Sequence, residues 1–282
     1  MLKELLKLQI LPFINPFIYD EIERMGEYSG VNNSINREAP LIVSLSSSKK
    51  NYKNLPIVLF SLLNQSLKPD NVILWLDEET EDLTTLPYEI TRFIKNGLEI
   101  RFIKNLNLYT NTICALEEFK NGIIVTACDN MYYRKNWLKR LYYSYIASPN
   151  DIHIHNALSI KIINNSIASI QKWEKVVNSE TAKYTNFPIT AGGILYPPNC
   201  FKKEAFRSDI FLKYAPQDDD VWFWIMAVIN NKKFRVVKNH DKSLVCLNIF
   251  DYITGMKTKN VSFDLQIDAL MKLYGQNVIS KL

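Results

Sequence analysis

The sequence predicts an α/β protein built around a mainly parallel β-sheet flanked by helices. Short apolar runs rich in β-branched residues alternate along the chain with segments whose apolar residues recur every three or four positions. The run at 123–127 is typical of a buried parallel strand, because all but one of its residues are apolar and an acid, Asp129, follows closely. Ligands bind at the carboxyl ends of such strands, so we expect Asp129 to lie in a cleft.

The composition is that of a globular protein that does not bind nucleic acid. The 282 residues are enough for one large domain or two smaller ones, and 47% of them are hydrophobic. The formal charge of +5 comes mostly from lysines scattered along the chain, so no nucleic-acid-binding stripe is predicted. An attraction to the phosphates of a nucleotide or to an anionic membrane surface stays open.

The cysteines and the apolar runs favour a cytoplasmic location. The four cysteines lie far apart and form no C-x-x-C pair, so neither a zinc site nor a disulfide framework is predicted. No apolar run reaches the ~18 residues that span a bilayer, and Lys3, Glu4 and Lys7 interrupt the signal-peptide pattern. We therefore expect a cytoplasmic protein, with the inner face of the membrane as the alternative location.

Residues 1–40 are predicted to form an amphipathic helix and a connector. The apolar residues between Leu2 and Ile10 recur at helical spacing until Pro12 stops the pattern. Such a helix either packs on the main domain as a flap or lies on a membrane surface or a partner. We favour the flap, because the polar face carries no dense cluster of Lys and Arg. Residues 19–39 are polar and Asn-rich, which is typical of a connector.

The next part of the chain alternates strand and helix patterns in the manner of a nucleotide-binding α/β unit. Leucines and valines in 55–63 recur at three-four spacing, as in a helix with one buried face. Alternating elements of this length imply right-handed crossovers and parallel strands. The predicted elements are strand 41–45, helix 55–63, strand 71–76 with Asp77 at its end, strand 98–103, helix 109–120 and strand 123–127.

The later elements are less regular. Residues 151–155 alternate as in a strand and put His153 and His155 on one face, either as two metal ligands or, as we favour, within an ordinary polar face. Residues 164–186 show no clear period. Paired glycines and prolines in 190–198 predict a loop wall, which either closes the fold or faces a substrate. The remaining predicted elements are helix 136–147, strands 234–237 and 243–248, and helix 264–274.

Three consecutive acids, Asp218, Asp219 and Asp220, precede an apolar segment with a helical pattern. Asp218 is placed as the N-cap, and the other two lie in the first turn, where the helix dipole favours negative charge. Three adjacent carboxylates repel one another, and a cation, a sugar hydroxyl or a proton among them would offset that repulsion. The helix is apolar on nearly every side, so we expect it to be buried and its start to be held rigidly.

Four segments, in this order, carry a resemblance to a known family. They are Ser61-Leu62-Leu63-Asn64-Gln65-Ser66-Leu67-Lys68-Pro69 with the run at 72–76, residues 124–130 with Trp137-Leu138, Gly192-Gly193-Ile194-Leu195-Tyr196-Pro197-Pro198, and Asp219-Asp220-Val221-Trp222. From about 41 to 274 the chain resembles bacterial glycosyltransferases of the GT-A fold, close to the large family-2 group. The resemblance implies a nucleotide-diphospho-sugar transferase fold in a single domain at 41–282. Its nucleotide-binding half is expected at about 41–150 and its acceptor half at about 151–282.

The resemblance also implies a donor site. In this family the first-strand loop and the acid after the second strand hold the nucleotide base, which by position assigns Ser44, Ser46 and Asp77. The acidic motif after the fourth strand binds the ribose and, through a divalent cation, the diphosphate. Asp129 is assigned to this donor contact and to a Mn or Mg ion, and Asn130 adds a carbonyl oxygen to the metal site.

In inverting members of the family, the late acidic pair supplies the general base that takes a proton from the acceptor hydroxyl. The resemblance assigns this role to Asp220, with Asp219 as its supporting neighbour and Asp218 as the third acid of the site.

The resemblance places the wall with Gly192, Gly193 and Tyr196 beside the acceptor. Trp222 could be a platform for a sugar, but we favour a place in the core, because its helix is predicted to be buried.

The chain departs from the family pattern in the donor half. The acid motif is Cys128-Asp129-Asn130 where members commonly have two or three acids, and Asn111 and Asn156 stand where Lys and Arg are usual. Metal binding is therefore expected to be weak, because a lone carboxylate supplies less charge. His240 lies where some members place a late metal ligand, although a single His before a strand is more often a surface residue.

The leading hypothesis is an inverting glycosyltransferase that moves a sugar from a nucleotide-sugar to a hydroxyl of a cell-surface glycan precursor. The alternative is a non-catalytic relative that binds a glycan, a nucleotide or a partner enzyme, which the neutral donor motif favours. A nucleotidyltransferase is more distant, because residues 46–50 lack the glycines of a phosphate-binding loop. No oligomeric state is predicted.

Overall fold

The computed structural model of the chain describes residues 30–176, 181–238, 244–247 and 249–282. The amphipathic helix predicted near the amino terminus and His240 lie outside these ranges. Within them, no helix is long and apolar enough to cross a membrane.

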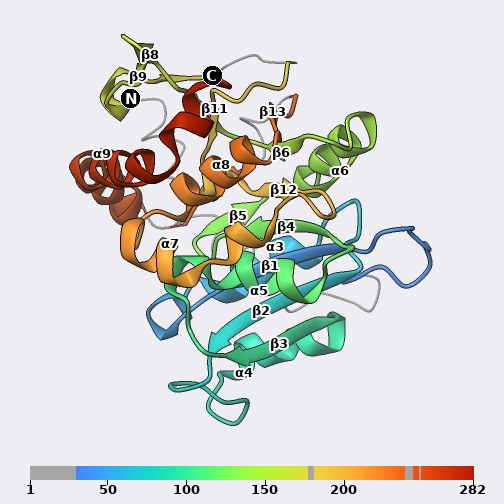
Figure 1. The fold of residues 1–282 in the computed structure, drawn as a ribbon. Helices are drawn as coiled ribbons and strands as arrows, with labels where there is room; N and C mark the ends of the chain where they lie inside the picture. Colours follow the sequence, from blue (N-terminus) through green and yellow to red (C-terminus); the bar gives the residue numbers. More distant parts are fainter. Residues whose placement is uncertain (1–29, 177–180, 239–243, 248) are drawn as a thin grey trace.

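A seven-stranded sheet forms the centre of the molecule, in the order β13-β6-β12-β4-β1-β2-β3 (Figure 1). Only β12 runs antiparallel to its neighbours among these strands. The predicted α/β class with a mainly parallel sheet is thus confirmed. The strands are β1 (Leu41–Ser46), β2 (Asn71–Asp77), β3 (Leu98–Ile103), β4 (Ile123–Ala127), β6 (Ile152–Ile154), β12 (Ile194–Tyr196) and β13 (Phe234–Val236).

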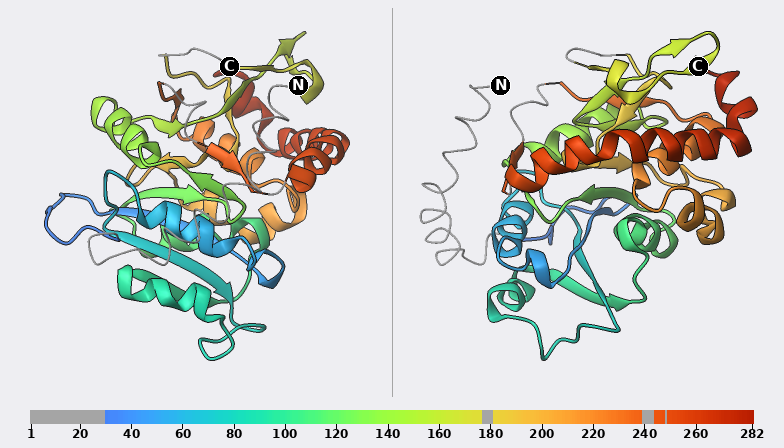
Figure 2. Two further views of the ribbon diagram at one scale, coloured as in Figure 1. Left: turned by 180° about the vertical axis from the view of Figure 1, so that it is seen from behind. Right: turned by 90° about the vertical axis from the view of Figure 1, so that its left-hand side faces the viewer.

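Helices cover both faces of the sheet. The side chains of β1 show why, because Leu41, Val43 and Leu45 enter one hydrophobic cluster while Ile42 enters the other. On the first side lie α3 (Leu55–Leu63) and α6 (Trp137–Ala147), and on the second lie α5 (Thr110–Glu118) and α8 (Asp219–Ile229). Figure 2 shows α3 in front of the sheet when the molecule is seen from behind.

Shorter elements complete the described chain. They are η1 (Lys49–Asn51), α4 (Tyr88–Thr91), η2 (Arg92–Asn96), η3 (Asn107–Tyr109), β5 (Met131–Tyr133), β7 (Ala157–Ser159), β8 (Ile162–Ile163), β9 (Ser166–Ile167), η4 (Ile170–Lys172), β10 (Glu174–Lys175), β11 (Asn186–Pro188), η5 (Thr190–Gly192), η6 (Lys203–Phe206), α7 (Ser208–Tyr214), β14 (Leu244–Cys246) and α9 (Ile249–Ile279).

Several sequence predictions need correction. The segment 190–198 is not only a loop wall, because β12 lies in the middle of the sheet, between β4 and β6. A strand of three residues is too short for its periodicity to reveal it. The strand near 243–248 is β14, which pairs with β5 outside the main sheet. The closing helix, predicted at 264–274, is α9 and begins at Ile249.

His153 in β6 and His155 just after it are buried rather than part of a polar face. His153 and His155 are both 0% exposed. The Nδ1 of His153 lies 2.8 Å from the Ser144 hydroxyl, and its Nε2 lies 3.0 Å from the Ser148 carbonyl oxygen. The Nε2 of His155 lies 3.1 Å from the carbonyl oxygen of Trp137. Both rings therefore fasten α6 and the turn after it to the sheet.

We expect the stability of the protein to fall as the pH drops below about 6.5. Burial lowers the pKa of His153 to about 4, while the Ser148 carbonyl and Asp151 oppose this shift and Arg235 adds to it. The unfolded chain binds the proton more readily, so the stabilisation is complete above pH 6.5 and is lost towards pH 4. The expected loss is up to ~3 kcal/mol in the free energy of unfolding.

Urea denaturation at several pH values measures this loss. The variant His153→Asn removes the titrating group but keeps a hydrogen-bonding side chain, so its stability should depend less on pH over this window. An identical pH dependence in the two proteins would show that His153 is not responsible.

Candidate active site

Asp129 lies at the carboxyl end of β4, where it meets the loop that follows β1. Its Oδ2 accepts a hydrogen bond of 2.7 Å from the Ser47 hydroxyl and one of 2.8 Å from the Asn51 amide. The contact follows from the parallel pairing of β1 with β4, in which Leu45 is opposite Ala127. Asp129 is half-buried, so its carboxylate is held by two donors and still reaches the surface.

Asp220 lies in the first turn of α8 and is held by Thr190. Its Oδ2 accepts a hydrogen bond of 3.2 Å from the Thr190 backbone N–H, and its Oδ1 accepts one from the Thr190 hydroxyl. Asp220 is 7% exposed. These two donors of Thr190 hold the Asp220 carboxylate in a fixed orientation.

The other two acids of the triplet differ from each other. Asp218 stands at the N-cap position of α8 and is 3% exposed, but its side chain makes no capping hydrogen bond. Asp219 is half-buried. The position predicted for Asp218 is therefore found without the capping bond that was expected of it.

Tyr133 connects the Asp129 loop with the Asp220 contact. Its hydroxyl accepts a hydrogen bond of 2.8 Å from the Cys128 backbone N–H and donates one of 3.4 Å to the Ala191 carbonyl. Cys128 precedes Asp129, and Ala191 follows the Thr190 that holds Asp220. Tyr133 thus bridges the backbone next to Asp129 and the backbone next to Thr190, which binds Asp220.

The acid triplet helps to raise the pKa of two buried tyrosines, Tyr109 and Tyr196. Burial raises the pKa of Tyr109, and the carboxylates of Asp219, Asp218 and Asp220 raise it further. The pKa of Tyr196 is also raised, first by burial and then by Asp220 and Asp219. Both phenols therefore stay protonated, and both lie close enough to the triplet for its negative charge to raise their pKa.

Of the predicted nucleotide-base contacts, Ser46 and Asp77 lie at one edge of the sheet, whereas Ser44 lies within β1. Ser44 is 0% exposed. Its hydroxyl donates a hydrogen bond of 2.6 Å to the Asn111 carbonyl and accepts one of 2.8 Å from the Trp75 indole N–H. Ser46 and Asp77 end β1 and β2 and are half-buried, so their side chains reach the surface.

The paired glycines are explained first by packing. Gly193 has a φ of 86° and ψ of 139°, and a Cβ there would lie 2.5 Å from the ring of Trp137. The same indole N–H donates a hydrogen bond of 2.8 Å to the Gly192 carbonyl. Tyr196 is 1% exposed, with its ring near Phe201. Gly192, Gly193 and Tyr196 were predicted to contact the acceptor. Their contacts in the structure are packing and hydrogen-bond contacts inside the protein.

Trp222 has the core position that we favoured. Its side chain is 0% exposed, and its indole N–H donates a hydrogen bond of 2.9 Å to the Ala205 carbonyl.

The described residues do not form a metal site on their own. Among them there is no group of three His, Cys, Asp or Glu side chains able to hold a cation. Asp129 uses Oδ2 for Ser47 and Asn51, and its neighbour Asn130 carries no charge. The donor set available at the end of β4 therefore does not fit a divalent cation held by protein groups alone.

Four residues of the site were not found by sequence reasoning. They are Ser47 and Asn51, which bind Asp129, together with Thr190 and Tyr133. Ser47 belongs to the run of serines after the first predicted strand, and Thr190 begins the predicted wall at 190–198. Both residues therefore lie in segments that the sequence analysis had singled out. Asn51 and Tyr133 had no such signal, because only the tertiary fold brings them to their partners.

The sequence matches no protein-family model and no curated protein. Among solved structures, the chain is similar to S. aureus TarS 1-349 in complex with UDP, with a TM-score of 0.47 and 15% identity over 72% of this chain and 59% of that one. A second crystal structure of S. aureus TarS 1-349 gives a TM-score of 0.47 and 15% identity over 79% of this chain and 65% of that one. The inositol-1-phosphate CTP transferase from T. maritima gives a TM-score of 0.40 and 10% identity over 72% and 86%. The chain thus spans less than two thirds of the length of the TarS fragment.

Proposed function

We propose that this protein is a nucleotide-sugar-dependent glycosyltransferase that transfers a sugar, with inversion, to a hydroxyl of a cell-surface glycan precursor. The observation that supports it is the Tyr133 hydroxyl, which bridges the backbone of Cys128, next to Asp129, and that of Ala191, next to the Thr190 that binds Asp220. This agrees with the motif order of the GT-A resemblance. The same proposal holds that residues 41–282 act as one domain. It also places the protein in the cytoplasm, with or without a membrane contact.

The donor side consists of Asp129, Ser46 and Asp77 at the ends of three neighbouring parallel strands. A carboxylate accepts hydrogen bonds from ribose hydroxyls, and half-buried polar side chains at adjacent strand ends can contact a base. We leave the Ser44 hydroxyl out of these contacts, because it is buried and already bonded to Asn111 and Trp75.

On the acceptor side, Asp220 accepts the proton of the acceptor hydroxyl. The acceptor oxygen then forms a bond to the anomeric carbon as the bond from that carbon to the diphosphate oxygen breaks. The electron pair leaves with the nucleoside diphosphate, and the proton remains on Asp220 until solvent removes it. Thr190 positions the carboxylate through its two hydrogen bonds, and Asp219 is its supporting neighbour.

None of these steps uses a divalent ion, and whether one takes part in nucleotide binding is left to experiment. The described protein groups do not hold one unaided, so a metal at Asp129 would need oxygen ligands from the nucleotide. Calorimetric titration with a panel of nucleotides and nucleotide-sugars, first with manganese and then with a chelator, tests the donor side directly. Binding of one diphosphate nucleotide supports the proposal, and binding of none contradicts it.

We expect Asp129→Asn to weaken binding of that nucleotide by roughly tenfold or more, because the charged hydrogen-bond acceptor is lost. The substitution keeps the shape of the side chain and an oxygen for Ser47 and Asn51. Asp209→Asn is a matched control, since Asp209 is an exposed carboxylate paired with Arg207. Equal affinities in all three proteins, with and without metal, would remove Asp129 from the donor site.

The non-catalytic relative remains the second candidate, because one observation favours it. Cys128 and Asn130 leave Asp129 as the lone acid of its motif, and that acid is already bonded to Ser47 and Asn51. Such a protein would bind a nucleotide or glycan and release no nucleoside diphosphate from any nucleotide-sugar.

A further inference from the structure

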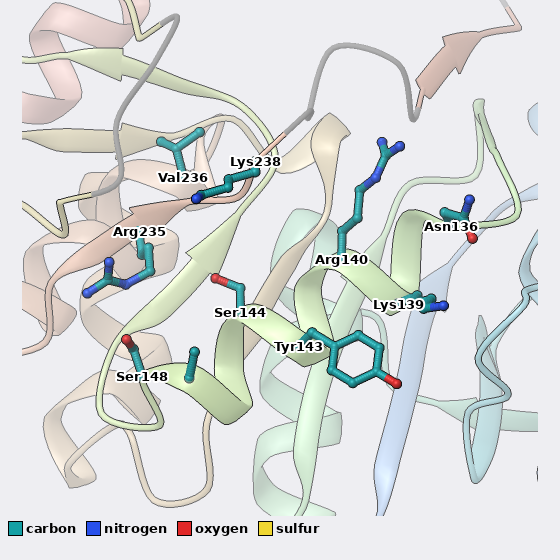
Figure 3. A pocket seen from close by; sticks show the side chains of 10 residues that line it. Asn136, Lys139, Arg140, Tyr143, Ser144, Ser148, Arg235, Val236 and Lys238 are labelled. Carbon is teal, nitrogen blue, oxygen red and sulfur yellow. The ribbon is translucent and has the colours of Figure 1, made fainter.

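A cleft of about 540 Å³ lies between α6 and the end of β13. Lys139, Arg140, Tyr143 and Ser144 line it from α6, where spacings of three and four residues place them on one side of the helix. Arg235, Val236 and Lys238 approach from β13 and the residues after it (Figure 3). The cleft is separate from the residues assigned above to sugar transfer.

Among its lining residues are four cations and no acid. The cations are Lys139, Arg140, Arg235 and Lys238. Asp151, which does not line the cleft, accepts a hydrogen bond of 3.0 Å from Nε of Arg235 and forms an ion pair of 2.8 Å with its Nη2. This pair fixes the guanidinium and offsets its charge, while Lys139 and Lys238 are exposed. A concave surface lined by charges of one sign attracts ligands of the opposite sign.

The positive charge continues beyond the cleft. Lys139 and Tyr143 also line a second cavity, of about 370 Å³, together with Lys68. Burial lowers the pKa of Lys68, and the charge of Lys135 lowers it further. Lys68 and Lys135, which do not line the first cleft, thus lie close enough for each charge to disfavour the other.

The rest of the lining suits an organic group. The ring of Tyr143 and the side chain of Val236 are apolar walls of the cleft. The Ser144 hydroxyl is bonded to His153, whose low pKa keeps that ring neutral at pH 7. The volume of about 540 Å³ is in the range of pockets that hold small organic ligands rather than a single ion.

We propose that this cleft binds a soluble phosphate ester, with its phosphate on Lys139, Arg140 and Lys238 and its organic part against Tyr143 and Val236. A phosphate offers several charged acceptors, which suits cations that line one cleft from two elements. The cations line a concave surface, which favours a soluble ester over the headgroups of a bilayer. The inference does not depend on the proposed sugar transfer.

The test is calorimetric titration of the whole chain with glycerol 3-phosphate, inorganic phosphate and, as the neutral control, glycerol. We expect binding of the two phosphates and none of glycerol. The double variant Lys139→Gln, Lys238→Gln should weaken phosphate-ester binding by about tenfold or more, through loss of two charge-assisted contacts. The matched control is Lys95→Gln, Lys272→Gln, which removes the same charge from two exposed lysines outside the cleft and should bind as the parent does.

Two comparisons locate the bound phosphate. Asp129→Asn should leave glycerol 3-phosphate binding unchanged. If Asp129→Asn abolishes glycerol 3-phosphate binding while the double variant of the cleft still binds it, the phosphate lies at the end of β4 and the inference is overturned. Binding to vesicles of phosphatidylglycerol and phosphatidylcholine without binding of the soluble ester would also overturn it. Failure to bind any nucleotide, with the ester still bound, contradicts only the proposed transferase.

Discussion

Replacing Asp220 by Asn is expected to lower the rate of sugar transfer by about a thousandfold, within the range that loss of a general base produces. The amide has nearly the same shape and retains an oxygen for Thr190, so the fold should be preserved. It cannot take the proton of the acceptor hydroxyl. Nucleotide binding should stay close to that of the parent, because Asp129 lies on the other side of the Tyr133 link.

The rate is measured as release of nucleoside diphosphate from the nucleotide-sugar that calorimetry identifies. Asp219→Asn is the matched control, since it removes a neighbouring charge from the same helix turn and should cost far less activity. Thr190→Val removes one donor to Asp220 and should lower the rate while shifting its pH profile. Unchanged turnover in Asp220→Asn, or complete loss in Asp219→Asn alone, would move the base away from Asp220.

Replacing Gly193 by Ala is expected to lower the free energy of unfolding by about 3 kcal/mol or more. The backbone at Gly193 has a φ of 86°, which L-amino acids with a side chain rarely adopt. The added Cβ would also lie 2.5 Å from the ring of Trp137, which is 0% exposed and held by the Gly192 carbonyl. The ring cannot move without breaking that hydrogen bond.

Denaturation in urea gives the comparison. Gly192→Ala is the control, because its φ lies outside that left-handed range and the nearest atoms to a Cβ are 3.2 Å away. We expect it to cost clearly less than the neighbouring substitution. If Gly193→Ala is as stable as the parent but loses acceptor binding, the glycine serves the acceptor and the packing explanation is wrong.

Much of the α/β framework could be predicted from the sequence, because its signals are local. The run at β4 shows its burial in consecutive residues, and the apolar spacing at 55–63 predicts the helix α3, although all nine of its residues are buried rather than one face. The position of Asp129 after β4 follows from the same local pattern. Asp218 at the N-cap of α8 is likewise predictable from the acids that precede an apolar helix.

The partners of the site residues could not be predicted in this way. Thr190 is 30 residues from Asp220, and Ser47 is 82 residues from Asp129. Such contacts depend on strand order and register, which no local period contains. The same reason explains His153 and His155, whose alternation is visible in the sequence while their contact with α6 is not.

The sequence by itself determined the class of fold and the order of most of the main strands and helices along the chain. It also determined the acid that follows β4 and the acids at the start of α8. Burial preferences and helix capping act between residues close in the chain, so they can be recognised there. Only the tertiary structure decided that β12 enters the sheet antiparallel, that Trp137 requires Gly193, and that Tyr133 bridges the backbone segments near the two acids. Those features arise where distant segments pack together, and the geometry of that packing decides which polar groups meet.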